Sequence, residues 1–195
     1  EFSVMNALAA IKTAAWLGIP VEKSSEALSL LTRIPGRAEK VEAGQDFLAI
    51  VDYAHTPDSL KALYGAYEKR RKICVLGNTG GGRDTWKRPL MGRIASESCD
   101  EVILTNEDPY DENPEEIVKA MTTEMTREPH IIMDRREAIR TALSMAQKGD
   151  AVLITGKGTD PYIMEANGAK TPWSDAQVVR EELERFHRGL CLNCR

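Results

Sequence analysis

The first segment suited to chemistry is the glycine-rich run Gly-Asn-Thr-Gly-Gly-Gly-Arg-Asp at residues 77–84. Its glycines let backbone N–H groups approach an anion, and the guanidinium of Arg83 can bind a carboxylate or phosphate through two hydrogen bonds. Lys87 and Arg88 follow at an expected helix start, where cations oppose the helix dipole unless an anion binds there. We therefore predict an anion-binding loop; the alternative is a flexible turn before a solvated basic helix start.

Asp52 and His55 form a second group, directly after the apolar residues 47–51. A carboxylate at a strand end can accept hydrogen bonds from ribose hydroxyls, and a histidine can bind phosphate or transfer a proton. Structural roles for both residues fit the sequence equally well. A third group, Gly-Lys-Gly-Thr-Asp at residues 156–160, is not a P-loop because a glycine separates its lysine from its threonine. The chain by itself therefore lacks the usual cradle for a triphosphate.

The four cysteines do not suggest a disulfide framework in a chain of this length. Cys74 lies in an apolar run and Cys99 near one, so we expect both to be reduced thiols in the core. Cys191 and Cys194 form a Cys-x-x-Cys pair that fits half of a zinc site, a redox pair or two free thiols in a tail. Because a zinc site needs about four ligands and no partner pair is evident, we expect no metal.

A composition of 42% hydrophobic and 29% charged residues, with a net charge of −4 over 195 residues, is typical of a globular protein. No apolar run approaches the roughly 18–20 residues that span a bilayer, and no signal peptide is recognisable. We therefore expect a soluble, cytoplasmic protein. Its mild acidity gives no general attraction to nucleic acid, and we interpret the basic cluster at residues 69–72 as a solvated helix end.

From residue 38 onward, short apolar runs alternate with amphipathic helical patterns. This alternation is typical of βαβ units and predicts an α/β fold, a mostly parallel sheet with helices on both faces. The expected strands are residues 47–51, 73–76, 102–104, 131–133 and 151–154. Residues 38–41 are expected to pair with the first strand in a hairpin. Helix N-caps are expected at Thr56, Asn113 and Asp134.

Two helical patterns, at about residues 4–15 and 22–31, precede the linker Ile34-Pro35-Gly36-Arg37. The first pattern already runs at residue 1 with no cap before it. We therefore expect the C-terminal piece of a longer protein. Its parts would be the last helices of a preceding domain (1–34), a second domain (35–187) and a tail (188–195).

Ligands of open parallel sheets bind beyond the carboxyl ends of the strands. The segments that follow the expected strands are therefore the candidate site: 52–55, 77–88, 105–110, 134–136 and 156–160.

Six strings that keep their order resemble one family, the Mur ligases. They are NALAAI (6–11), IPGRAEKV (34–41), VDYAHTPDSL (51–60), GGRDTWKRPLMG (81–92), LTNEDP (104–109) and GKGTD (156–160). The similarity extends to about residue 187 and is greatest to the branch that adds the third residue of the peptidoglycan stem peptide. It implies an ATP-dependent ligase that joins a free amino acid to UDP-MurNAc-L-Ala-D-Glu through an acyl phosphate, with roles in cell-wall synthesis, cell shape and cell division.

The resemblance also implies a Rossmann-like C-terminal domain preceded by two helices left from the central ATPase domain. ATP, Mg²⁺ and the UDP-sugar would be held mainly by the central and N-terminal domains of the same protein, so this chain alone is expected to be inactive, with no catalytic residue certain within it. Asn6 and Arg37 would contact the nucleotide, with Asp52 near its ribose and His55 in the same pocket. Lys87 and Arg88 would lie behind Arg83 and supply supporting charge only. The implied amino-acid site comprises Arg83, which would bind the α-carboxylate, with Glu107, Asp108, Pro109, Tyr110, Gly156 and Asp160.

Family members that use diaminopimelate have Asp-Asn-Pro-Arg at the specificity loop, where this chain has residues 107–110, Glu-Asp-Pro-Tyr. A tyrosine cannot replace a bidentate guanidinium, and the two acids of this loop would repel a distal carboxylate. The closing motif also differs, with Thr159 in place of a histidine and Asp160 in place of a glutamate. We therefore expect lysine, or another residue with a cationic or neutral side chain, unless Arg135 or Arg136 supplies the missing cation.

Two alternatives stay open. A folylpolyglutamate synthase-like ligase would share the architecture without these strings. A non-catalytic binding module would dock onto a partner that carries the ATPase.

Overall fold

The computed structural model describes the backbone of residues 2–31 and 34–192 and the side chains of residues 4–31 and 34–186. It divides into two compact units, Glu1–Ile34 and Pro35–Arg195. Within the described residues, no helix is long and apolar enough to cross a membrane.

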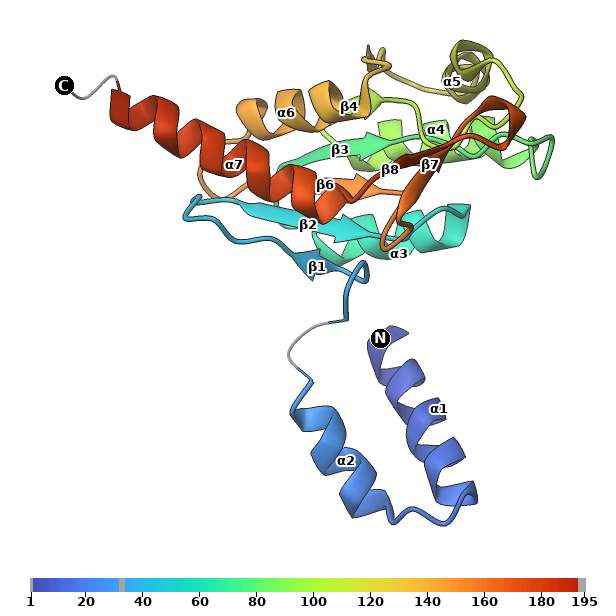
Figure 1. The fold of residues 1–195 in the computed structure, drawn as a ribbon, viewed down its shortest axis with the longest axis vertical. Coiled ribbons are helices and arrows are strands. Elements are labelled where there is room, and N and C mark those ends of the chain that lie inside the picture. Colours follow the sequence, from blue (N-terminus) through green and yellow to red (C-terminus); the bar gives the residue numbers. More distant parts are fainter. Residues whose placement is uncertain (1, 32–33, 193–195) are drawn as a thin grey trace. The chain divides into compact units, whose positions relative to one another are not determined.

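The second unit is built on one sheet in which six strands of the described chain lie in the order β1-β2-β6-β3-β4-β5 (Figure 1). The strands are β1 (Glu39–Lys40), β2 (Leu48–Asp52), β3 (Lys72–Leu76), β4 (Glu101–Leu104), β5 (His130–Ile131) and β6 (Ala151–Thr155). The pair β1–β2 is antiparallel and all other pairs are parallel, so the predicted hairpin and parallel sheet are both confirmed. The fifth strand begins slightly earlier than predicted, at His130, whose side chain is exposed as expected for an edge position.

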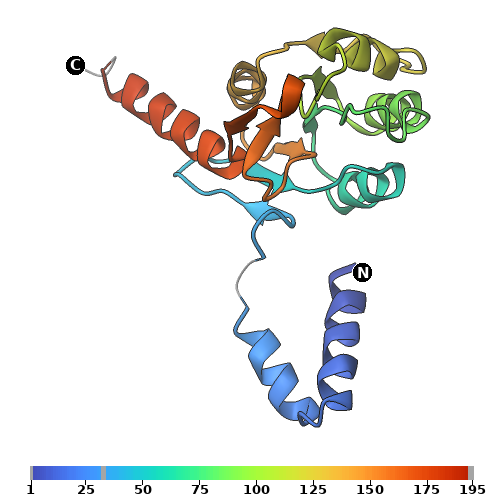
Figure 2. The same cartoon turned by 45° about the vertical axis from the view of Figure 1, so that its right-hand side comes forward.

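Helices cover both faces of this sheet (Figures 1 and 2). They are α3 (Pro57–Ala66), α4 (Lys87–Ser98), α5 (Pro114–Thr122), α6 (Arg135–Met145) and α7 (Asp175–Leu192). Alternate strand residues point to opposite faces: Cys74 and Leu76 pack with α3, α4 and α5, whereas Ile73 and Val75 pack with α6 and α7. The α/β fold class with two covered faces is thus confirmed.

Three helices begin where the sequence predicted. The side chains of Thr56, Asn113 and Asp134 accept hydrogen bonds from the backbone N–H groups of Ser59, Glu115 and Glu137. Each bond satisfies a donor of the first turn that has no partner within the helix. The caps therefore fix where each loop ends and its helix begins.

Strand β6 comes late in the chain but lies between β2 and β3. Asp52 on β2 is level with Thr155 on β6, and Val75 on β3 is level with Ile154. Because these strands are parallel and in register, the loops that follow β2, β6, β3 and β4 emerge at one edge of the sheet. This topology brings together segments that are up to a hundred residues apart in sequence.

A small hairpin was not predicted. Strands β7 (Tyr162–Met164) and β8 (Lys170–Pro172) form a separate antiparallel pair joined by the 3-10 helix η1 (Ala166–Gly168). The backbone N–H of Tyr110 donates to Met164 O (3.1 Å), and the N–H of Asn167 donates to the carboxylate of Asp111 (2.7 Å). The hairpin therefore packs against the loop that follows β4.

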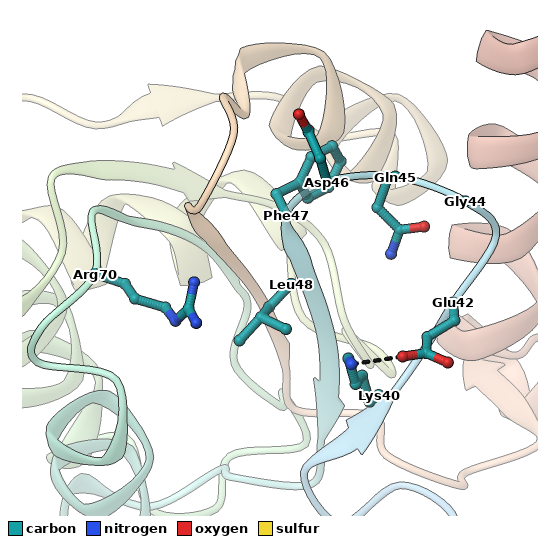
Figure 3. A pocket seen from close by; sticks show the side chains of 8 residues that line it. All are labelled: Lys40, Glu42, Gly44, Gln45, Asp46, Phe47, Leu48 and Arg70. Carbon is teal, nitrogen blue, oxygen red and sulfur yellow. Dashed lines mark ion pairs between the residues drawn. The ribbon is translucent and has the colours of Figure 1, made fainter.

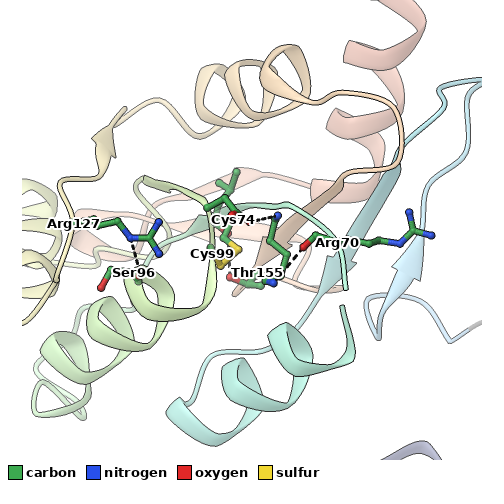
Figure 4. The surroundings of a disulfide bond; sticks show 9 residues. Arg70, Cys74, Ser96, Cys99, Arg127 and Thr155 are labelled. Atoms are coloured by element: carbon green, nitrogen blue, oxygen red, sulfur yellow. Dashed lines mark hydrogen bonds between the residues drawn. A yellow bond between two sulfur atoms is a disulfide. The ribbon is translucent and has the colours of Figure 1, made fainter. Parts of the chain in front are cut away.

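The expectation that Cys74 and Cys99 are reduced was wrong. The two side chains are buried, as expected, but they form a disulfide between β3 and the residue that follows α4 (Figure 4). The pairing is not visible in the sequence because α4 returns the chain across the sheet over a separation of 25 residues.

Two further expectations need correction. The basic cluster at residues 69–72 is not a solvated helix end, because α3 ends at Ala66 and Arg71 forms ion pairs with Asp150 (2.9 Å) and Glu101 (3.1 Å).

The proposed tail from residue 188 is also helical as far as Leu192, since no proline interrupts the pattern of α7. Cys191 and Cys194 lie outside the residues whose side chains are described, so the roles expected for them are not addressed by the structure.

The first unit consists of helices α1 (Phe2–Trp16) and α2 (Val21–Ser29). None of the described side chains in α1 or α2 is buried, and Trp16 is 86% exposed. An apolar hollow between them is lined by residues that include Leu8, Ile11 and Val21. Unpaired apolar surface of this kind gives two helices little stability of their own.

For the 195-residue chain, we therefore expect amide hydrogen exchange to be fastest in α1 and α2 and slowest in β3 and β6. Hydrogen-exchange mass spectrometry measures this directly. Protection across residues 3–31 equal to that of β3 and β6 would contradict the expectation.

Reduction of the Cys74–Cys99 disulfide should lower the free energy of unfolding by about 3 kcal/mol, since the bond closes a loop of this length in the unfolded chain. Urea unfolding with and without reductant measures the change. The double variant Cys74→Ala, Cys99→Ala is the control and should not respond to reductant. An equal response of both proteins would show that the bond is absent.

Candidate functional site

The loops after β3, β4 and β6 meet at the carboxyl edge of the sheet. The backbone N–H of Gly80 donates to Asp108 O (2.7 Å), which joins the glycine-rich loop to the loop after β4. A Cβ atom at Gly80 would lie only 2.1 Å from Pro109 O, so no larger residue fits this contact. The structure thus brings together the segments that hold Arg83, Asp108 and Asp160.

A buried ion pair joins the loops after β4 and β6. The ammonium of Lys157 lies 2.8 and 2.6 Å from the two carboxylate oxygens of Asp108, and Asp160 lies 3.6 Å away. The Lys157 side chain is 1% exposed, and Asp108 also accepts the backbone N–H of Met164 (2.8 Å). Since a buried charge is costly to leave unpaired, this pair fixes the two loops relative to each other. Sequence reasoning assigned no role to Lys157.

Glu107 lies deep beneath the same loops. Its Oε1 accepts a hydrogen bond from Thr79 Oγ1 (3.0 Å), while Oε2 has no partner among the described residues. Burial raises the pKa of the Glu107 carboxyl, an effect opposed by the nearby charges of Arg135 and Lys157. Gly156, at φ +106°, lets the backbone pass close to this carboxyl, because a Cβ there would lie 2.1 Å from Oε2.

The burial of Glu107 and Asp108 corrects the charge argument made from the sequence. Glu107 is 3% and Asp108 6% exposed, and the charge of Asp108 is balanced by Lys157. Neither carboxylate is therefore accessible at the protein surface, where a ligand would bind. Their presence therefore does not by itself attract an ammonium group.

The glycine-rich loop already holds a carboxylate of the protein. Glu112 accepts a hydrogen bond from the backbone N–H of Gly82, and it pairs with the guanidinium of Arg88 at 2.9 Å. These two donors hold the pKa of the Glu112 carboxyl below its usual range. Arg88 is 6% and Lys87 8% exposed, so the alternative of a solvated basic helix start was wrong. Two of the predicted anion-binding donors are thus used within the protein.

Arg83 differs from these cations. Its side chain is exposed, no described carboxylate pairs with it, and its guanidinium lies over the ring of Tyr110, 5.8 Å from the ring centroid. Arg83 therefore lies at the carboxyl ends of the strands, and its N–H donors are available to a ligand.

Arg135 and Arg136 cannot supply a further cation to this edge. Arg135 forms a buried bidentate pair with Asp175 (2.9 and 2.7 Å) and also donates to Thr155 O (2.8 Å). Arg136 pairs with Glu181 and Glu182 on α7. Both arginines thus hold α7 onto the fold.

A second cluster follows β2. The two carboxylate oxygens of Asp52 accept the backbone N–H groups of Ala38 (2.6 Å) and Ala54 (2.7 Å), so this residue holds the chain where the strand ends. The guanidinium of Arg37 lies 4.9 Å from the centroid of the Tyr53 ring, and the His55 ring packs edge-on against Tyr53 at 4.7 Å. Tyr53, which sequence reasoning missed, therefore links two residues expected at the nucleotide.

The residues of this cluster fit only in part the ATP and Mg²⁺ that the family resemblance implies. Arg37, Tyr53 and His55 offer a cation and aromatic surface, but the described edge has no phosphate cradle beyond the loop filled by Glu112. No group of three His, Cys, Asp or Glu residues in the described chain is arranged to hold a metal ion. Asn6 is exposed on α1 in the first unit.

One hollow of the second unit lies away from these loops. A depression of about 480 Å³ is lined by residues that include Lys40, Glu42 and Arg70, at the amino end of β2 (Figure 3). It lies at the opposite edge of the sheet from Arg83, and its Lys40–Glu42 pair is exposed. We therefore do not assign it to the candidate site.

Asp108→Asn should lower the free energy of unfolding by about 3 kcal/mol, because the buried ammonium of Lys157 loses its compensating charge. The matched control is Glu124→Gln, which breaks the half-exposed pair with Arg93 and should cost less than about 1 kcal/mol. Urea unfolding measures both. Equal, small changes would contradict a stabilising role for the buried pair.

Comparison with known proteins agrees with this geometry. Residues 36–158 match the family described as "Mur ligase, glutamate ligase domain". Two similar curated proteins are both named UDP-N-acetylmuramoyl-L-alanyl-D-glutamate--2,6-diaminopimelate ligase. That of Caldanaerobacter subterraneus subsp. tengcongensis is 47% identical over 93% of this chain and 38% of its own length, and that of Aquifex aeolicus is 43% identical over 94% and 38%.

A solved structure of a ligase with the same name is 35% identical, with a TM-score of 0.73 over 96% of this chain and 39% of that one. A folylpolyglutamate synthase from Thermotoga maritima, at 23% identity and a TM-score of 0.56 over 77% of this chain and 34% of its own, shares the fold. The chain spans less than two fifths of the length of the curated relatives named above. The fold, the converging loops and the family match agree, and the chain therefore belongs to the Mur ligases, with residues 36–158 as the glutamate ligase domain.

Proposed function

We propose that the protein containing this chain is an ATP-dependent ligase that adds the third amino acid to UDP-MurNAc-L-Ala-D-Glu during peptidoglycan synthesis. The names of the relatives support the reaction, and the observation that carries it here is the unpaired guanidinium of Arg83 at the edge where three loops converge. In this proposal residues 1–34 end the central ATPase domain, and the enzyme works in the cytoplasm.

The proposed reaction forms an amide in two steps. The γ-phosphoryl group of ATP passes to the D-Glu side-chain carboxylate, which releases ADP; the amine then attacks this acyl phosphate, forms the C–N bond, loses a proton and expels phosphate. Arg83 binds the α-carboxylate of the incoming amino acid and so holds its amine for attack. Arg37 and His55 contribute contacts to the nucleotide.

The amino acid used by this protein is a separate part of the proposal. The relatives are named for 2,6-diaminopimelate, but Tyr110 stands where the family pattern for that substrate has an arginine. Arg135 and Arg136 are both engaged by acids of α7, so neither replaces it. A second, distal carboxylate would therefore lack a bidentate partner, and we propose L-lysine as the preferred substrate.

The test is an assay of the full-length protein with ATP, UDP-MurNAc-L-Ala-D-Glu and separate amino acids, with phosphate release and product mass as readouts. We expect a tripeptide product, with a higher kcat/KM for L-lysine than for meso-diaminopimelate. Preference for diaminopimelate would overturn the choice of amino acid alone. No product with any amino acid, or glutamate addition to a reduced folate instead, would overturn the proposed reaction.

A further inference from the structure

The backbone of Tyr110 is tied to other elements at the candidate site. Its backbone N–H donates to Met164 O (3.1 Å) on β7, and its neighbour Asp108 is fixed by the buried ammonium of Lys157. Tyr110 has a φ of +52°, a conformation that is uncommon for a residue other than glycine and that persists where surrounding contacts enforce it. The backbone around this ring is therefore tied to two other elements.

The glycine-rich loop approaches this ring closely. A Cβ atom at Gly81 would lie 3.6 Å from Cδ2 of Tyr110, so the ring faces the backbone of that loop. Glu112 accepts the N–H of Gly82 and thereby ties the next residue of the loop to the same segment. The Arg83 guanidinium that follows lies over the Tyr110 ring, at 5.8 Å from its centroid.

A guanidinium can bind two partners through different surfaces. When it stacks on a ring it contacts the ring with its flat face, whereas its five N–H donors point outward within the plane. An arginine held by its face therefore keeps its hydrogen-bonding edge available to a carboxylate. A long side chain that is already ordered also loses less conformational entropy when the ligand binds.

We infer that Tyr110 is a positioning residue that holds the guanidinium of Arg83 through its ring, ready to bind the α-carboxylate of the incoming amino acid. The inference rests on the proposed function, because it uses the role of Arg83 proposed above. It gives Tyr110 a role in ligand binding that does not require the phenol to contact the ligand.

The experiment measures KM for L-lysine and for meso-diaminopimelate, and separately KM for ATP, in the full-length protein. Tyr110→Leu should raise the amino-acid KM about two- to fivefold, the range expected for an exposed cation–π contact, and leave the KM for ATP unchanged. Tyr110→Phe keeps the ring and should stay within about twofold of the parent. In an Arg83→Ala background, Tyr110→Leu should have no further effect, because its action passes through Arg83.

Tyr162→Leu is the matched control, since it removes a similar contact between Tyr162 and Lys170 (5.7 Å) on the β7–β8 hairpin, and it should leave both KM values unchanged. An equal loss in Tyr110→Phe and Tyr110→Leu, or an undiminished effect of Tyr110→Leu without Arg83, would overturn the inference alone. An unchanged amino-acid KM in Arg83→Ala would overturn both the proposed role of Arg83 and the inference.

Discussion

The buried ion pair between Lys157 and Asp108 is the interaction on which the candidate site depends. It joins the loops after β6 and β4, and Asp108 additionally holds the β7–β8 hairpin through the N–H of Met164. Separating these loops would leave an ammonium or a carboxylate buried without its partner, which costs several kcal/mol. The position of Tyr110, and through it that of Arg83, follows from this constraint.

The charges around this edge are mostly balanced within the protein. Asp108 neutralises Lys157, Glu112 neutralises Arg88 and Asp175 neutralises Arg135. Arg83 stands apart, because no described carboxylate pairs with its guanidinium. A group of loops whose buried charges are paired and whose exposed Arg83 lies over an aromatic ring suits a small anionic group such as an α-carboxylate.

Much of the fold could be predicted from local patterns in the sequence. The strands at residues 73–76 and 151–154 were predicted from their apolar runs. Three helix starts were predicted from capping residues, namely Thr56, Asn113 and Asp134. Both kinds of signal depend only on neighbours within a few residues. Convergence of the loops was also predictable, since the carboxyl ends of parallel strands share an edge.

Contacts between distant segments could not be predicted in this way. The Cys74–Cys99 bond, the Glu112–Arg88 pair and the Lys157–Asp108 pair each join residues whose approach depends on how helices and hairpins pack. The acidic residues Glu107 and Asp108 illustrate the consequence. In the sequence they look like substrate contacts, but burial and pairing remove them from the surface.

The most direct test of the site compares an amino acid with its α-carboxamide. L-Lysine and L-lysinamide share the reacting amine, so kcat/KM for the two in the full-length protein isolates the contribution of the α-carboxylate. Binding by Arg83 predicts strong discrimination against the amide in the parent protein, and loss of most of that discrimination in Arg83→Ala. Equal discrimination in both proteins would contradict α-carboxylate binding at Arg83.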